Sequence, residues 1–524
     1  MMGYAAVALV ALLIVLIVRK LWEVLKIVVL RPYAITKTFE KQGIRGPPYK
    51  LLYGCLDEVK KMKKLANEKV LDTNCNDITS RVLPHYHKWF SEFGDTLLYW
   101  YGTQPRITIT NPELAKQILS NKFGFYVKPK TRPILRNLIG DGLVFAEGLD
   151  WVRHRRVLNP AFSIDKLKIM TKKMAECTIS MLDEWKILAG LTEEQRIKIE
   201  MNANFQKLTA DIIAHTAFGS SYVEGKEVFK ALKELQTCCV ASDTDIFIPG
   251  SQYLPTPSNL QTWKLSRKLK NSLKVIIESR LSAKAATDGH YGDDLLGIMI
   301  ESSVAEADGD SKVTPKLNMK EIMENCKSFF FAGHETTSSL LTWSVFLLST
   351  HPEWHEKLRE EVLKECGMGI PDADMLSKLK FVNMFLLEVL RLYCPVIMLI
   401  RKAPEDMKLG NLMIPKETCL TIPFVKIHRS KEYWGEDANE FKPLRFANGV
   451  SKAGKHPNAL LAFSIGPRVC IGQNFAMLEA KTVVALILQR FSLSLSPEYK
   501  HAPIDHVTLH PQYGLPIIVK SLLR

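Results

Sequence analysis

The sequence feature that most restricts the possible folds of this chain is a lone cysteine between two glycines. Residues 463–472 read FSIGPRVCIG, and Cys470 lacks the closely spaced cysteine and histidine partners of a zinc site, since the nearest upstream histidine, His456, stands alone. In residues 473–491 the apolar side chains recur at helical spacing, which places Cys470 at a helix N-terminus. The helix dipole and free backbone N–H groups there favour a negatively charged sulfur. The loop therefore predicts one thiolate that is available to a metal.

The first residues predict a membrane anchor. The stretch from Tyr4 to Val18 carries no charge and ends at Arg19 and Lys20. As a helix it spans about 22 Å of a bilayer core of about 30 Å, so a crossing needs the residues on either side as well. A cleaved signal peptide carries basic residues before its apolar run, whereas here they follow it. We therefore expect an uncleaved anchor at residues 1–30, with the body of the chain in the cytosol by the positive-inside rule.

A hinge and one large domain are expected after the anchor. Pro47 and Pro48 fix backbone angles and oppose helix formation in the segment GIRGPPYK. We expect the hinge at residues 31–48 and a single domain at 49–524, because no long Gly/Ser-rich or Pro-rich linker follows. Two short polar stretches, 283–294 and 302–313, are predicted to be surface loops between helices.

Composition narrows the partners and the redox state. The chain has 524 residues, 47% of them hydrophobic, which is ample for a large core. Its ten cysteines are irregularly spaced and, in a cytosolic body, are expected to be reduced, which argues against a disulfide at Cys470. The formal net charge of +15 is spread along the chain without a nucleic-acid-binding motif, so no nucleic-acid partner is expected. An anionic membrane surface and an acidic protein partner fit this charge better.

The cysteine segment resembles a known cofactor loop. The pattern Phe463-x-x-Gly466-x-Arg468-x-Cys470-x-Gly472 is similar at each defining position to the haem-binding loop of the cytochrome P-450 superfamily. The resemblance implies haem b with Cys470 as the axial thiolate, whose electron push favours O–O cleavage. It also implies that Gly466 permits a sharp turn, that Gly472 lets the backbone approach the sulfur, that Phe463 packs beside the sulfur and that Arg468 neutralises a haem propionate.

A second motif of the same family interrupts an apolar helical segment at residues 329–348. The sequence there contains Ala-Gly-x-Glu-Thr. Uncompensated polar groups inside an apolar helix cost free energy, so their presence suggests a function. The resemblance implies that Thr336 hydrogen-bonds bound dioxygen and that Glu335 helps to relay protons. It also implies that Gly333 allows a local widening of the helix beside the iron.

Two further motifs follow the family order. Glu388 and Arg391, three residues apart, share a helix face. The resemblance implies that they join Arg445 in a buried network that braces the cysteine loop. Leu444 departs from the glutamate that the family often has next to this arginine, but Arg445 itself is retained.

The resemblance also implies propionate contacts outside the cysteine loop. Trp151 and Arg155 lie four residues apart and face the same way on a helix. They match the family's propionate-binding pair, and Arg401 matches another propionate-binding arginine. His154 and its neighbouring arginines are predicted to be exposed charges.

The implied fold is a mainly helical cytochrome P-450 body with a smaller β-rich portion near the N-terminus, preceded by the membrane anchor helix. Residues 96–102 and 106–110 are β-rich and predict a hairpin of strands. Segments such as KQGIRGPPYKLLYG, RVLPHYHKW and FFFAGHETT resemble a plant clan that includes secologanin synthase and cytokinin hydroxylases. The implied localisation is the endoplasmic reticulum membrane, and plant secondary metabolism is the implied setting.

The implied reaction is monooxygenation of a hydrophobic small molecule of terpenoid, fatty-acid or isoprenoid-hormone type, by hydroxylation or another oxidation. Electrons are expected from an NADPH-cytochrome reductase, because the chain has no Gly-rich phosphate loop for flavin or nicotinamide. Two alternatives stay open. A haem-thiolate isomerase or dehydratase acts without a reductase and commonly departs from the Glu335–Thr336 pair, and a non-enzymatic membrane haem protein has no need of Thr336.

Overall fold

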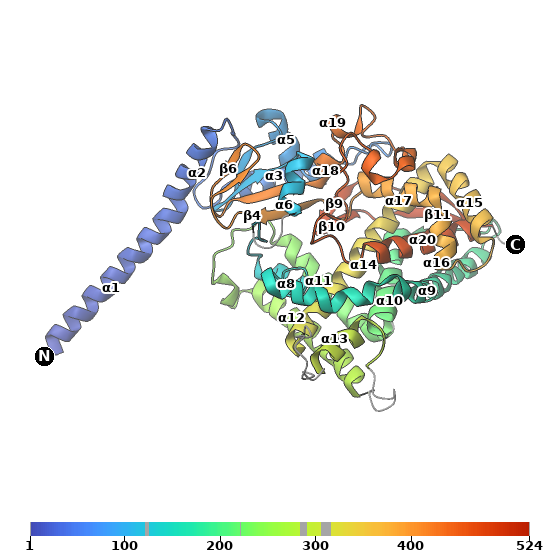
Figure 1. Cartoon of the computed structure of the whole chain (residues 1–524), viewed down its shortest axis with the longest axis horizontal. Helices are drawn as coiled ribbons and strands as arrows, with labels where there is room; N and C mark the ends of the chain where they lie inside the picture. The colour runs from blue at the N-terminus through green and yellow to red at the C-terminus, as the bar shows by residue number, and fades with distance from the viewer. Residues whose placement is uncertain (1, 121–124, 221, 283–290, 305–315, 523–524) are drawn as a thin grey trace, which may run out of the picture.

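The computed structural model describes residues 2–120, 125–220, 222–282, 291–304 and 316–522, so most of the two predicted polar loops lies outside the described residues. Helices make up most of the body; β4 and β6 lie on the side from which the N-terminal helix projects, whereas β11 lies on the opposite side, toward the C-terminus (Figure 1). The described helices of eight or more residues are α1 (Met2–Leu25), α2 (Arg31–Glu40), α3 (Leu56–Asn67), α5 (Pro84–Phe93), α6 (Pro112–Leu119), α8 (Gly148–Leu158), α9 (Ile164–Gly190), α10 (Met201–Phe218), α11 (Tyr222–Ala241), α12 (Pro257–Ser282), α13 (Leu295–Val304), α14 (Met319–Thr350), α15 (Pro352–Cys366), α17 (Lys380–Leu392) and α20 (Gln473–Arg490).

The strands form small sheets. The largest has the order β1-β2-β7-β4, in which β2 and β7 are parallel and the other pairs antiparallel. Strands β1 and β2 form the predicted hairpin, and the expectation of a mainly helical fold with a smaller β portion is confirmed. The strand bounds are β1 (Leu98–Tyr101), β2 (Gln104–Thr108), β3 (Arg196–Glu200), β4 (Met398–Lys402), β5 (Met407–Leu409), β6 (Leu412–Ile414), β7 (Cys419–Pro423), β8 (Phe491–Leu495), β9 (Pro503–His506), β10 (Thr508–Pro511) and β11 (Pro516–Ser521).

Helix α14 crosses the middle of the body and organises the core. It begins at a capping box, in which the Asn318 side chain accepts from the Glu321 N–H and the Glu321 carboxylate accepts from the Asn318 N–H. Most of its residues are buried, and it packs most extensively against α10. Trp343 stacks on Tyr393 at 4.5 Å between ring centroids, which ties α14 to the end of α17. The long helix is therefore a fixed reference for the site that it lines.

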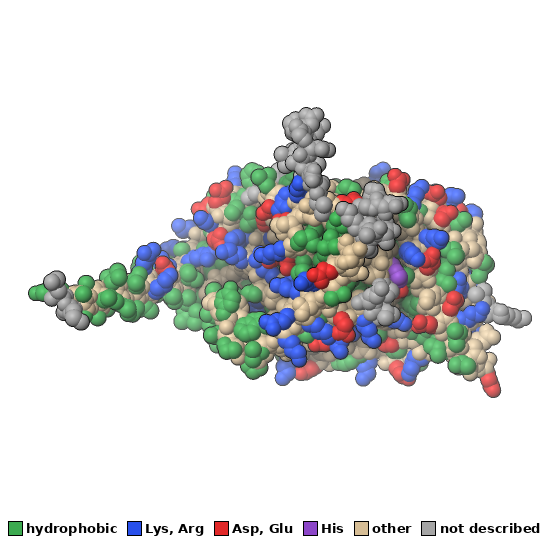
Figure 2. Space-filling view, turned by 90° about the horizontal axis from the view of Figure 1, so that it is seen from below, with side chains coloured by type: hydrophobic (Ala, Val, Ile, Leu, Met, Phe, Trp, Pro, Cys, Tyr) green, Lys and Arg blue, Asp and Glu red, His purple; other side chains and the backbone are tan. Residues whose placement is uncertain are grey.

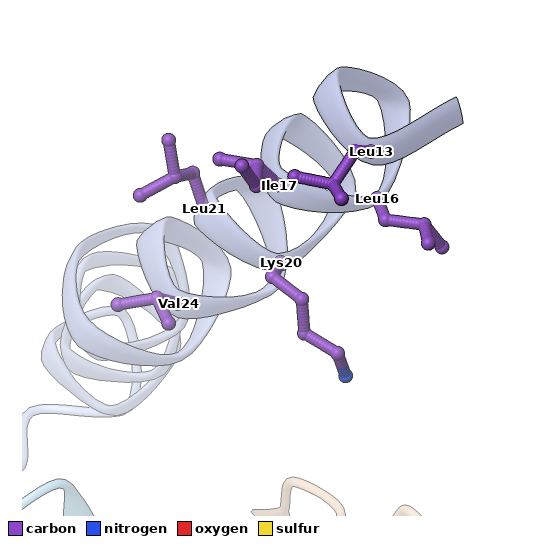
Figure 3. Close-up of a pocket in the computed structure, with 6 residues that line it drawn as sticks. All are labelled: Leu13, Leu16, Ile17, Lys20, Leu21 and Val24. Atoms are coloured by element: carbon purple, nitrogen blue, oxygen red, sulfur yellow. The ribbon is translucent and has the colours of Figure 1, made fainter. Parts of the chain in front are cut away.

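The N-terminal helix stands out from the body. From Tyr4 to Glu40 it is one helix of 37 residues, about 55 Å long, with a π-helical turn at Lys26–Leu30. In its N-terminal part, the side chains of Leu13, Ile17 and Leu21 project away from the helix (Figure 3) and are at least half exposed. In the space-filling view this projecting helix is largely hydrophobic, whereas the body is rich in Lys and Arg (Figure 2). Such a surface is stable in lipid rather than in water, which supports the predicted anchor.

The predicted hinge at residues 31–48 needs a correction in its first part. Residues 31–40 are helical, because Pro32 occupies the first turn of α2, where a missing N–H is tolerated. Phe39 is fully buried against the body, and the Gln42 side chain exchanges two hydrogen bonds with the backbone of Met413. The non-helical segment therefore starts only after Glu40, with a turn at 41–43 followed by the stretch that contains Pro47 and Pro48.

Candidate active site

The cysteine loop folds as a tight turn before α20. The Cys470 N–H donates to the carbonyl oxygen of Phe463 at 2.9 Å, and the Val469 N–H donates to that of Gly466 at 3.0 Å. Gly466 has a φ of +79°, and a Cβ there would lie 2.5 Å from the Cα of Ser120 at the end of α6. Glycine is therefore required at 466 both by the backbone conformation and by the neighbouring chain.

The Cys470 sulfur sits at the N-terminus of α20, as the sequence predicts. Its side chain is exposed, yet burial raises the pKa of its thiol, while the Gly472 N–H and the charge of Arg155 act in the opposite direction. The thiol is therefore accessible to solvent although protein surrounds most of it. A Cβ at Gly472 would lie 4.0 Å from the sulfur, an ordinary contact, so the polypeptide itself does not require glycine there.

Three cations, Lys128, Arg401 and Arg468, form a basic cluster around one carboxylate, Glu147. An Arg468 Nη atom lies 2.9 Å from one oxygen of Glu147, and the backbone N–H of Lys128 donates to the other oxygen at 3.2 Å. Burial and the charge of Arg468 lower the pKa of Arg401 to about 10. Burial and the charges of both arginines lower the pKa of Lys128 well below its usual range. One carboxylate does not balance three cations among the described residues, so the cluster is suited to an anionic group.

Trp151 and Arg155 lie on α8, next to the cysteine loop. An Arg155 Nη atom donates to the carbonyl oxygen of Val469 at 3.0 Å, directly before the cysteine. The guanidinium of Arg468 lies 4.8 Å from the centre of the Trp151 ring, within the range of a cation–π contact. The two residues that the family resemblance pairs are thus brought to the same loop.

The prediction that His154 is exposed is wrong. Its side chain is buried, and its Nδ1 lies 3.2 Å from the side-chain nitrogen of Asn325 on α14. Arg153 pairs with Glu321 at 2.6 Å, whereas Arg156 is exposed as predicted. The reason is that the buried face of α8 includes the turn between Trp151 and Arg155, where His154 points toward α14.

The polar side chains expected on α14, Glu335 and Thr336, point to different sides of the helix. Ala332, Gly333 and Thr336 are partly exposed within an otherwise buried stretch of α14. The Thr336 hydroxyl donates to the carbonyl oxygen of Ala332 at 2.7 Å. The predicted widening of the helix at Gly333 is wrong, since α14 is α-helical throughout. A Cβ at Gly333 would lie 2.7 Å from Ile213, so the glycine serves the close packing of α14 on α10.

Glu335 points into a buried polar network. One carboxylate oxygen lies 2.7 Å from Nε2 of His510 and accepts from the Gln236 amide at 2.5 Å and the Thr508 hydroxyl at 3.1 Å. Burial by itself raises the pKa of Glu335, but His510, together with His334 and Gln236, outweighs it and lowers the pKa below its usual range. The carboxylate is therefore held ionised and oriented by β10 and α11.

Glu388 and Arg391 form a fully buried, bidentate ion pair on α17, with both nitrogen–oxygen distances at 2.7 Å. Arg391 also donates to three backbone carbonyl oxygens in the segment that leads to the cysteine loop. Arg445 Nε lies 3.5 Å from Glu388, but its stronger partner is Asp437, at 2.8 Å. The predicted three-residue group is thus assembled, with Asp437 as a fourth member, and the departure at Leu444 is exposed and outside it.

Sequence reasoning missed Lys128 and His510. Val127 pairs with Lys402 on the edge of β4, and this isolated bridge places Lys128 in the basic cluster. His510 reaches Glu335 because Ser339 of α14 donates to the backbone of β10 at Leu509. Neither residue belongs to a local sequence motif, so the pattern of neighbouring residues does not identify them.

Comparison with known proteins identifies the family. The cytochrome P450 family model matches residues 77–517. Cytochrome P450 709B3 of Arabidopsis thaliana is 56% identical over 511 residues, covering 97% of each chain, and cytochrome P450 709B1 of the same plant is 55% identical over 526 residues, covering 99% of this chain and all of the relative. Secologanin synthase 1 of Catharanthus roseus is 40% identical over 517 residues, covering 98% of each chain. The accessible cysteine, the basic cluster and these matches lead to one conclusion: the chain belongs to the cytochrome P450 family.

Proposed function

We propose that this haem-thiolate monooxygenase uses Cys470 as its axial ligand and oxidises a hydrophobic small molecule with electrons from an NADPH-dependent reductase. Membership of the family establishes the haem, the cysteine thiolate and the monooxygenase class. One observation supports Cys470 as the axial ligand. Its accessible thiol occurs in the same chain as a basic cluster that, among the described residues, holds only one carboxylate.

The residues around Cys470 fit haem b. Its two propionates supply the negative charge that the basic cluster lacks, and Arg401, Arg468 and Lys128 are the groups that would hold them. Arg155 and Trp151 complete that side from α8. A side chain at Gly472 would meet no polypeptide closer than the sulfur, so the chain leaves room there that a bound haem would occupy.

Bound haem supplies the activation of dioxygen, and the chain supplies proton control and a dry site. Thr336 holds a proton at its hydroxyl on the half-exposed face of α14, and Glu335 stands next to it with an ionised carboxylate. His510 orients that carboxylate and connects it to Asn202, whose Oδ1 lies 3.1 Å from its Nδ1. These hydrogen-bonded groups extend from Glu335 through His510 to Asn202 at the start of α10.

The substrate is proposed to be an apolar plant secondary metabolite. Val396, Leu399 and Ile400, at and before β4, are half-buried beside Arg401, which fits an apolar wall near the cofactor. One relative is named for the synthesis of secologanin, a name that supports a plant metabolite as the class of substrate. Hydroxylation of a terpenoid, fatty acid or isoprenoid hormone is consistent with these features.

The function is tested by co-expressing the full chain with a plant NADPH-cytochrome P450 reductase and comparing the metabolites with those from the Cys470→Ala chain. We expect an oxygenated product that depends on NADPH and on Cys470. Full turnover of a hydroperoxide without NADPH or reductase would instead establish the isomerase or dehydratase function. Haem binding without NADPH-dependent product or peroxide would support a non-enzymatic haem protein.

Thr336→Ala is expected to uncouple NADPH consumption from product formation. Without the hydroxyl, the product formed per NADPH falls roughly tenfold or more, since a positioned proton-transfer group is worth on the order of 10²–10⁴ in rate. The measurement is NADPH, hydrogen peroxide and product in the same reaction. Thr337→Ala is the matched control. Like that of Thr336, the Thr337 hydroxyl donates to the helix backbone, but the Thr337 side chain is buried. Equal coupling in the two alanine variants would contradict the role of Thr336.

We also propose that the chain sits in the endoplasmic reticulum membrane with its body in the cytosol. Deleting residues 2–25 is expected to release part of the protein from membranes with haem retained, as measured by fractionation and absorbance. Deleting residues 2–43 also removes the fully buried Phe39 and the Val28 carbonyl that accepts from Tyr49, so it is expected to lower the melting temperature. Complete membrane retention of both variants would place the main attachment elsewhere on the body.

A further inference from the structure

A second group of metal-binding side chains lies away from the haem site, between α9 and α10. Cys177 of α9 meets Asp211 and His215 of α10, and one ligand atom from each lies within 4.8 Å of the others. Asp211 and His215 are four residues apart, so they share one helix face, and their closest oxygen–nitrogen distance is 3.5 Å. Cys177 is buried and the other two are partly exposed, so the group is accessible from one side.

An independent observation comes from α20, which packs along α9. Glu479 is 1% exposed, and neither of its carboxylate oxygens has a hydrogen-bond partner among the described residues. A buried carboxylate without a partner is costly, and burial accordingly raises the pKa of Glu479 well above its usual range. Burial, then Asp211 and more weakly Glu479 raise the pKa of the Cys177 thiol, so the Glu479 carboxylate lies within electrostatic reach of the same group.

The lysine charge that acts on the Cys177 thiol is already paired with a glutamate, so it does not strongly oppose a bound cation. The nearest lysine that acts on Cys177 is Lys173, one turn earlier on α9, and its ammonium is paired with Glu176 at 2.7 Å. The group thus combines one sulfur, one imidazole nitrogen and one carboxylate, with a second carboxylate behind it. This is a ligand set that zinc accepts and that calcium and magnesium do not favour, because those ions prefer oxygen ligands only.

We propose that Cys177, Asp211 and His215 form a binding site for a single zinc-type divalent ion, with water at the fourth position and Glu479 behind the group. The site joins α9 to α10, and through Glu479 it reaches α20, the helix that starts directly after the cysteine loop. It is separate from the haem assignment, so its failure leaves the proposed function intact.

The test is a cadmium titration of the detergent-solubilised, full-length haem-loaded protein, followed by the ultraviolet cadmium–thiolate difference band. We expect saturation at one cadmium per chain, competition by zinc and loss of the band in Cys177→Ser. The variants His215→Gln and Asp211→Asn are expected to bind about tenfold more weakly or worse. Cys366→Ser is the matched control, because this thiol is also buried but lies outside the group.

Haem content, read from the reduced carbon monoxide spectrum, shows that each variant is folded. If Cys177→Ser does not retain haem, the two α10 variants decide the question, since both positions are partly exposed and tolerate a polar substitution. A saturable band that depends on Cys177 and His215 supports the site. Absence of a saturable band in the unsubstituted protein, or an unchanged affinity in His215→Gln and Asp211→Asn, overturns it.

Discussion

Replacing Cys470 by alanine is expected to abolish the thiolate-type carbon monoxide difference band and all NADPH-dependent product. The chain keeps its fold, because the side chain of Cys470 is exposed and the loop is shaped by Gly466 and by backbone hydrogen bonds that alanine preserves. What is lost is the sulfur, whose electron donation distinguishes a thiolate haem from an imidazole one. The measurements are the reduced carbon monoxide spectrum and metabolite analysis of the same membranes.

Cys394→Ala and Cys75→Ala are suitable controls for the loss of a thiol. Cys394 is buried near the end of α17 and Cys75 is partly exposed, and neither belongs to the cysteine loop. Both variants are expected to keep the thiolate band. A thiolate band that persists in Cys470→Ala would show that a different cysteine binds the iron, and the axial assignment would have to be withdrawn.

Glu388→Ala is expected to cost about 3–5 kcal/mol of unfolding free energy, because it leaves the guanidinium of Arg391 buried without its counter-charge. A domain is typically stable by only about 5–15 kcal/mol, so little haem-loaded protein should accumulate. The loss should also reach the cysteine loop, since Arg391 holds three carbonyl oxygens of the segment before it. Thermal unfolding and haem content per chain are the measurements.

Glu176→Ala provides a matched control for this prediction. Glu176 pairs with Lys173 at the same helical spacing and at the same 2.7 Å distance, but both side chains are exposed to solvent. Exposed pairs contribute about 0–1 kcal/mol, so this variant should unfold almost like the unsubstituted protein. Similar losses for the exposed and the buried pair would show that burial is not what makes Glu388 important.

Much of the fold and site could be predicted because local patterns determine them. The glycine-bounded cysteine, the Glu388–Arg391 spacing and the Trp151–Arg155 spacing each fix side chains on one loop or one helix face. The structure brings the Trp151–Arg155 pair to the cysteine loop, and Arg391 holds the carbonyl of Ala438 in the segment before it. Resemblance to the family then placed Arg401 and Arg445, which no local periodicity identifies.

The errors arose where the environment of a residue depends on distant segments. His154 is polar and flanked by arginines, yet its burial depends on the approach of Asn325, far along the chain. Gly333 reads as a flexible point until Ile213 of α10 is packed against it. The orientation of Glu335 depends on His510, which comes from a strand near the C-terminus. A single sequence carries no sign of these pairings, because they are set by tertiary packing.

The continuous N-terminal helix has a consequence for how the enzyme meets its membrane. Phe39 and Gln42 fasten the end of α2 to the body, so the helix acts as a stiff lever rather than as a tether. Under the proposed membrane attachment, a bilayer that sets the tilt of the apolar segment would therefore also set the inclination of the whole body. A thinner or thicker membrane would then rotate the body relative to the plane of the bilayer.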